Sequence, residues 1–240
     1  MSEAIHVAPR PSIRVPVHEL RRRYRELMMG ESFSLPRRLF TTFGATAAAI
    51  SLCLACLSRP QLYELWVIPV ALLYGTFAEH CAHRWAMHRE VGRLERIFLE
   101  HRVHHKHFTH EAMHAVDPGD FQMIMSSGAL LTYFVAVFVL PPALLPWLLV
   151  SRNAALIYIA VGIGYFAAFE LLHIVAHLDP AHALSRWLPG AGLIQRRHKL
   201  HHNPRLQLEV NFNVVLPLAD IVLGASPRAQ AESVDYRSSS

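Results

Sequence analysis

Long stretches without a charged side chain constrain this fold more than any other feature of the sequence. Residues 39–58 are twenty consecutive uncharged positions, which rise about 30 Å as a helix, the thickness of a hydrocarbon core. Similar apolar stretches cover about 61–81, 121–140 and 154–178. Only 17% of the residues are charged and 52% are hydrophobic, and blocks of this kind are not the periodic pattern of a soluble core. We therefore expect an all-α integral membrane protein with about four transmembrane helices in two hairpins.

The distribution of positive charge predicts the orientation of these helices. Eight arginines precede the first stretch, six Lys or Arg residues separate the second from the third, and seven follow the fourth, whereas the two remaining loops hold only Arg59 and Arg152. Positively charged loops stay in the cytoplasm. We therefore expect both termini and the middle loop to be cytoplasmic, with no secretory signal in the polar, basic residues before the first stretch.

The rest of the chain completes the expected organisation. Residues 1–38 form a basic cytosolic segment, and residues 39–225 form the membrane domain. Within that domain, 83–120 and 179–225 are expected to build a helical cap on the cytosolic side. The tail, 226–240, has no apolar run, and we expect it to be disordered.

The basic run Arg21-Arg22-Arg23-Tyr24-Arg25 and the net charge of +5 raise the question of a nucleic-acid partner. A juxtamembrane segment that faces anionic lipid explains both features more simply, so we expect no nucleic acid. Cys53 and Cys56 lie in the middle of the first stretch among apolar residues, and we expect no disulfide.

Histidine is the residue type that indicates function. Ten of the seventeen histidines fall into four groups with regular spacing. The groups are His83 and His88; His101, His104 and His105; His173 and His177; and His198, His201 and His202. On a helix, positions i, i+3 and i+4 share one face, so each H-x-x-H-H group is expected to direct three imidazoles to one point. All four groups lie at or beyond the cytoplasmic ends of the expected spans, which predicts that they meet.

The first group is less regular. A step of five residues leaves His83 and His88 about 140° apart on an ideal helix. Either the two rings bracket a metal ion from two sides, or the helix is irregular at this point.

Ten imidazoles exceed the coordination number of one ion, so we expect two metals. Imidazole suits iron, zinc, copper or nickel, and the residue types alone do not choose among them. A pair of zinc ions saturated by histidine has little chemistry to perform beside a membrane, whereas two irons can reduce dioxygen. Metal-bound histidines commonly donate their other N–H to a carboxylate or a carbonyl, and four acidic residues beside the groups are candidates for this role. These are Glu79, Glu100, Glu170 and Asp220.

Two other functions compete with this interpretation. The segment HEAMH (110–114) fits the H-E-x-x-H pattern of zinc metalloproteases, in which two histidines on one helical face hold zinc and the glutamate is the general base. The second alternative is a non-catalytic protein that binds or transports metal. Transport favours ligands inside the spans, yet most of the grouped histidines lie at or beyond the membrane boundary.

Four segments carry a resemblance to a known family. They are EHCAHRWAMH (79–88), HRVHHKH (101–107), GYFAAFELLHIVAH (164–177), and RRHKLHHNP together with NFNVVLPLADIVLGA (211–225). In order and spacing they resemble the motifs of the fatty acid hydroxylase and sterol desaturase superfamily of membrane di-iron oxygenases, over roughly residues 70–225. The loop around HEAMH is longer than in relatives, and Ala219-Asp220 replaces the usual Trp-Asp.

The resemblance implies that the ten histidines hold two iron ions and that the protein hydroxylates or desaturates a lipid or fatty acyl chain with O2. The substrate is expected to enter from the membrane. The chain contains no cytochrome b5-like heme segment, so we expect a separate electron donor, either a ferredoxin or a cytochrome b5-like protein with its reductase. The choice between hydroxylation and desaturation stays open, as does the choice among fatty acyl, ornithine-lipid, sterol-like and carotenoid substrates. The identity of the electron donor and the oligomeric state also stay open.

Overall fold

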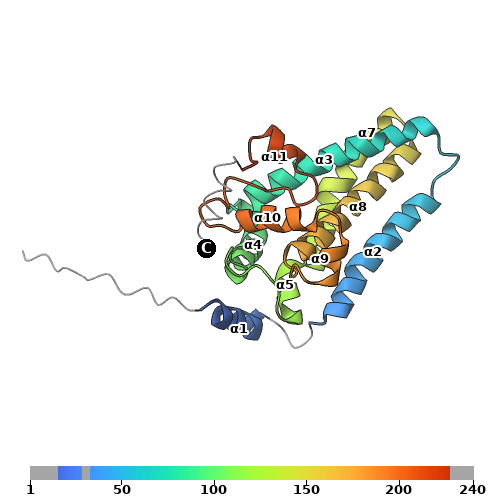
Figure 1. Ribbon diagram of the computed structural model, residues 1–240. Coiled ribbons are helices and arrows are strands. Elements are labelled where there is room, and N and C mark those ends of the chain that lie inside the picture. Colours follow the sequence, from blue (N-terminus) through green and yellow to red (C-terminus); the bar gives the residue numbers. More distant parts are fainter. Residues whose placement is uncertain (1–15, 29–32, 228–240) are drawn as a thin grey trace, which may run out of the picture.

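Four long apolar helices form the body of the molecule (Figure 1). The computed structural model describes residues 16–28 and 33–227, and these residues contain helices and one isolated bridge between Thr109 and Ala112, but no strand. Each of the four helices is long and apolar enough to cross a membrane. They are α2 (Leu35–Ala55); η1 (Leu62–Trp66), α3 (Val67–Cys81) and η2 (Ala82–Met87) as one continuous rod; α6 (Gly128–Phe134), η5 (Val135–Val139) and α7 (Leu140–Leu149) as another; and α8 (Arg152–Ala176). The expectation of an all-helical chain with four candidate spans is confirmed.

The third apolar helix, Leu130–Leu149, lies closer to the C-terminus than the expected 121–140. The backbone is extended at Met125, and the Ser127 side chain accepts a hydrogen bond from Leu130 N (3.2 Å), which starts a new helix there. Pro141 does not end the helix. It follows the π-helical segment η5 and lies in the first turn of α7, where a missing N–H is tolerated.

Helix α8 is the central helix, and α2, α3 and α7 all pack against it. Helices α7 and α8, which follow one another in the sequence, pack against each other, whereas α2 packs mainly on α8 and not on α3, its neighbour in sequence. Gly75 of α3 explains one close approach, because a Cβ at this position would lie 2.9 Å from the Tyr165 ring of α8. Small residues allow transmembrane helices to approach in this way.

The remaining helices gather at one end of the four long helices (Figure 1). Two of them, α4 and α10, carry the H-x-x-H-H groups, and the chain outside the spans folds around them. These elements are α1 (Val17–Met28), η3 (Gly92–Leu94), α4 (Glu95–His107), η4 (Pro118–Asp120), α5 (Phe121–Ile124), α9 (Ala183–Trp187), α10 (Ala191–His201) and α11 (Leu218–Val222). They come from the segments 88–120 and 179–225 and from part of the N-terminal segment. Residues 83–87, which the sequence assigned to the cap, continue the second long helix, which runs to Met87 and not to 81. The expected disordered tail lies almost entirely outside the described residues.

Candidate metal centre

Nine of the ten predicted ligands come together in two adjacent groups. Within each group one nitrogen from every ring lies within 4.8 Å of the others. The first group is His83, His88, His101, His105 and His201, and the second is His104, His177, His198 and His202. The tenth histidine, His173, lies beside the second group, with its ring centroid 4.8 Å from that of His104 and 4.9 Å from that of His198.

The first pair of histidines meets because its helix is irregular. Residues 82–87 form a π-helix, η2, whose wider turn brings positions five apart toward one face. The rings of His83 and His88 are stacked, with centroids 5.3 Å apart and an angle of 15° between their planes. Of the two arrangements that the sequence left open for this pair, the structure has the irregular helix.

Each H-x-x-H-H segment serves both groups. On α4, His101 and His105 face the first group, whereas His104 faces the second. On α10, His201 faces the first group, and the other two histidines of the segment face the second. The expectation that each segment directs its three imidazoles to one point is therefore wrong. Positions one and three residues apart diverge around the helix, and the two helices run past both groups.

Backbone carbonyls orient most of these rings. Six of the ten histidines place Nδ1 at 2.5 to 3.0 Å from a carbonyl oxygen, and each of these Nδ1 atoms must therefore carry the ring proton. The pairs are His83 with Phe212, His104 with Met123, His173 with Ile124, His177 with Met113, His201 with Val210, and His202 with Phe108. In the neutral ring this leaves Nε2 with a lone pair, which is the form that binds metal.

The Nε2 atoms converge at distances that suit coordination to a cation. In the first group four Nε2 to Nε2 distances are 3.0 or 3.1 Å, and in the second group three are between 2.9 and 3.1 Å. Nitrogen ligands about 2.1 Å from an ion and at right angles to each other lie about 3.0 Å apart. Each group can therefore hold one metal ion.

Burial keeps the histidines neutral. For the eight grouped histidines outside the apolar helices, burial is the largest cause that lowers the pKa, and neighbouring imidazoles lower it further. They are His88, His101, His104, His105, His177, His198, His201 and His202. A site of neutral imidazoles can accept a metal without first losing protons.

Two of the predicted acidic residues act on the backbone and not directly on the grouped histidines. Asp220 accepts hydrogen bonds from the backbone N of Phe212 (3.2 Å) and Asn213 (3.0 Å). Glu79 accepts from Val214 N (2.6 Å), from the Asn213 side chain and from Tyr165. They fix the segment whose Phe212 carbonyl orients His83.

Glu170 has a similar position on the other side of the centre. Both of its carboxylate oxygens accept from Ser126 N, two residues beyond Ile124, whose carbonyl orients His173. Glu100 differs from the other three. It is exposed and accepts a hydrogen bond from Arg96 Nε at 2.8 Å in a surface ion pair, so its position does not support the predicted role.

Two buried histidines that the sequence analysis did not select pair with aspartates behind the centre. His80 Nδ1 lies 2.8 Å from Asp220, and His107 Nε2 lies 2.8 Å from Asp120. Each aspartate also binds an arginine, Arg197 and Arg25 respectively. Burial alone would raise the pKa of Asp120, but hydrogen bonds from His107, a backbone N–H and the arginine outweigh burial and lower it. The sequence contained one sign of their position: His80 lies three residues before His83, and His107 lies three residues after His104, so each is one helical turn from a grouped histidine.

The segment 110–114 is not a helix. It consists of turns and loop around the bridge from Thr109 to Ala112, so its two histidines do not share the helical face that a metalloprotease site requires. Instead, Met113 is buried and its carbonyl oxygen lies 2.8 Å from His177 Nδ1. The backbone of this segment therefore supports the second histidine group.

An apolar cavity leads from the long helices to His83, and its empty space, open mouth included, is about 720 Å³. Aromatic side chains line its membrane end, including Phe134, Tyr165 and Phe166. A second cavity shares Leu130, Phe169 and His83 with the first and continues to the histidines; His101, His104 and His173 line it. Two other aromatic residues of these segments do not line the cavities: Phe121 packs in a separate apolar cluster and Trp85 is 43% exposed.

Comparison with known proteins identifies one family. The family model described as fatty acid hydroxylase matches residues 68–225. This range contains both histidine groups, His173 and the cavity. None of the curated proteins and none of the solved structures matches the chain.

Proposed function

The chain belongs to the fatty acid hydroxylase family, and from this premise we propose that it is a membrane di-iron oxygenase. The family implies an oxidoreductase that acts on lipids, and the four apolar helices indicate a multi-pass integral membrane protein. The proposed reaction uses O2, two electrons and two protons. Hydroxylation of a methylene yields an alcohol and one water, whereas desaturation yields a double bond and two waters.

The observation that carries the proposal is the convergence of imidazole lone pairs beside an apolar cavity. The first and second histidine groups would each hold one iron, with His173 as a further ligand at the second. A pair of irons supplies the one-electron steps that reduction of O2 and attack on a C–H bond require. All of the proposed ligands are neutral nitrogens, so the centre carries the full positive charge of its metals.

The residues of the cavity bind and position the lipid chain. The cavity lies among three of the long apolar helices, and its wall is almost entirely apolar, which suits an acyl chain. Phe134 and Phe166 have ring centroids 5.1 Å apart and narrow it on one side. A chain that enters from the membrane would pass these rings and place a methylene near His83 and His173, with water excluded around it.

The distribution of positive charge supports a cytoplasmic position for the centre. The Lys and Arg residues concentrate in the segments that build the histidine-rich end and in the N-terminal segment. By the positive-inside rule we infer that the centre and both termini face the cytoplasm. A cytosolic electron carrier, a ferredoxin or a cytochrome b5-like protein with its reductase, would then reach the centre.

Lipid mass spectrometry of cells with and without the gene tests the proposal. We expect a lipid that gains one oxygen or loses two hydrogens only when the gene is present, only with O2, and not with the His104→Ala variant. Metal analysis of the purified chain should find two irons. One exchangeable zinc per chain, with no lipid product and no need for oxygen, would overturn the proposal.

A further inference from the structure

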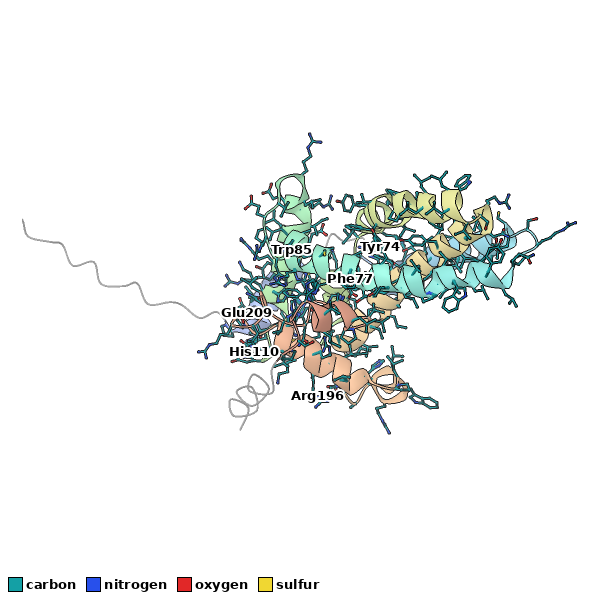
Figure 2. All side chains as sticks on the ribbon, turned by 90° about the horizontal axis from the view of Figure 1, so that it is seen from above. Tyr74, Phe77, Trp85, His110, Arg196 and Glu209 are labelled. Carbon is teal, nitrogen blue, oxygen red and sulfur yellow. The ribbon has the colours of Figure 1, made fainter. Side chains whose placement is uncertain are left out.

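A surface depression lies over the segment 110–114, which the proposed function leaves without a role for its side chains. Most of its polar lining comes from three parts of the chain: α1 contributes Arg21, the segment contributes His110 to His114, and α10 contributes Arg196 and Lys199. Figure 2 labels His110 and Arg196, and both lie at the histidine-rich end of the molecule. Its volume is about 970 Å³ including the open mouth.

The depression is basic. Its lining includes three cationic side chains and one acidic residue, Glu111, whose side chain is 79% exposed at the rim. Arg21 donates hydrogen bonds to three carbonyl oxygens, those of His107 (2.8 Å), His114 (2.9 Å) and Ala112. Arg21 is buried, and the carbonyl groups hold its guanidinium in place beneath the surface without neutralising its charge. Arg196 is exposed and Lys199 partly exposed, so positive charge faces the solvent.

The floor of the depression is one hydrogen bond from the metal centre. The carbonyl of Met113, which lines the depression, accepts from His177 Nδ1 at 2.8 Å. Ala115 N donates in return to the carbonyl of His177 at 2.8 Å. On the other wall, Arg196 and Lys199 flank His198, whose Nε2 lies 2.9 Å from that of His177. A partner seated here therefore reaches the second histidine group through a short path of bonded and hydrogen-bonded atoms.

We propose that this depression is the docking site for a small acidic one-electron carrier protein. The inference rests on the proposed function, which needs two electrons per O2. In each encounter the reduced carrier loses one electron to the metal pair and leaves oxidised, so that two encounters complete one turnover. Complementary charge steers such encounters and fixes their orientation.

An anionic membrane surface is the other occupant that basic residues suit. The shape favours a protein, because the surface is concave and its floor is hydrogen-bonded to His177. Contact with lipid headgroups would not require this connection to the histidines. Contact with anionic lipid is therefore an outcome of the test and not the proposal.

Binding measurements on the full chain in nanodiscs of neutral lipid test the docking site. The probes are two acidic carriers, a fluorescently labelled [2Fe–2S] ferredoxin and a soluble cytochrome b5 domain, titrated at low and at physiological salt. The double variant Arg196→Glu, Lys199→Glu should weaken binding of the preferred carrier by about tenfold or more at low salt and reduce the salt dependence of Kd. The matched control, Arg93→Glu with Arg102→Glu, reverses two exposed charges outside the depression and should leave Kd unchanged.

Three results would overturn the docking site. The unmodified protein could bind neither carrier, or the two double variants could lose the same affinity. The third is a variant at Arg196 and Lys199 that binds the carrier as before and loses binding only to phosphatidylglycerol vesicles. Turnover of the unmodified chain with dithionite judges the proposed function separately, since a small chemical reductant does not need to dock. Carrier binding at the depression without such turnover would retain the docking site and reject the oxygenase.

Discussion

The Nε2 atoms of His104 and His202 lie 3.1 Å apart, although in each ring the proton is on Nδ1, which donates a hydrogen bond to a backbone carbonyl. Neither Nε2 has a hydrogen to share, so the two lone pairs face each other inside the protein. Two acceptors at this distance repel unless a cation lies between them. The fixed tautomers therefore argue for a metal more directly than the number of histidines does.

Removal of one of these rings should empty the second group. For His104→Ala we expect the metal content to fall from two ions per chain to about one, because loss of this ligand leaves three close nitrogens and His173, which lies outside the close group. Metal analysis by mass spectrometry of the purified variant measures this. The control is His18→Ala, an exposed histidine on α1, which should retain both ions. Full metal content in the His104 variant would exclude this residue as a ligand.

Acid should destabilise the metal-free protein. The pKa of His104, His177, His202 and the other grouped histidines outside the spans is lowered in the folded state, chiefly by burial. The unfolded chain therefore binds more protons than the folded chain below the ordinary histidine pKa of about 6.5, and stability falls as pH falls. Each such histidine contributes up to about 1.4 kcal/mol per pH unit below that value. Thermal unfolding of chelator-treated protein between pH 8 and pH 5 measures the effect; a flat profile would contradict it.

Asp220 should matter for stability and Glu100 should not. Asp220→Asn removes the charge that pairs with Arg197 and His80 and weakens the hold on Phe212 N. Loss of one partner of a buried ion pair typically costs about 3–5 kcal/mol. Glu100→Gln removes only an exposed pair with Arg96, worth less than about 1 kcal/mol. Denaturant unfolding in detergent compares the two variants, and equal destabilisation would contradict a structural role for Asp220 in fixing the segment around Phe212.

Two glycines offer a matched test of helix packing. Gly75→Ala places a methyl group 2.9 Å from the Tyr165 ring, and overpacking of this kind costs about 1–3 kcal/mol. The same change at Gly164 meets only Ile50 Cδ1 at 3.8 Å, an ordinary contact, so it should be neutral or slightly stabilising. Thermal midpoints of the two variants should therefore move apart. A Gly75 variant as stable as the Gly164 variant would show that α3 and α8 are less closely packed.

The cavity can be blocked without removing a ligand. Leu130 lines both connected cavities, so Leu130→Trp should fill the route between them. We expect both metals to be retained and lipid turnover to fall about tenfold or more, measured as product per iron. Leu148→Trp, at an exposed position on α7, is the control. Normal turnover in the Leu130 variant would place the substrate elsewhere.

Local composition and spacing predicted much of this protein. Hydropathy depends only on which residues are adjacent, so the sequence predicted four apolar helices. The predicted range of the third helix lay too close to the N-terminus. The extended backbone at Met125 and the position of Pro141 in the first turn of α7 decide that range, and hydropathy reports neither. The spacing of the histidines indicated a centre for two metals and the family, and the family is confirmed.

Only the tertiary structure decided how the histidines divide and what holds them. His104 and His105 are adjacent in the chain yet belong to different groups, because a helix turns by about 100° per residue and the two histidine groups lie on different sides of α4. The partners that fix the rings are carbonyl oxygens, as at Phe108 for His202 and at Phe212 for His83. Every residue has a carbonyl, so no sequence pattern marks the few that the fold brings to a grouped histidine. For the same reason the sequence did not reveal that the Met113 carbonyl orients His177, since the side chains of residues 110–114 suggested a protease.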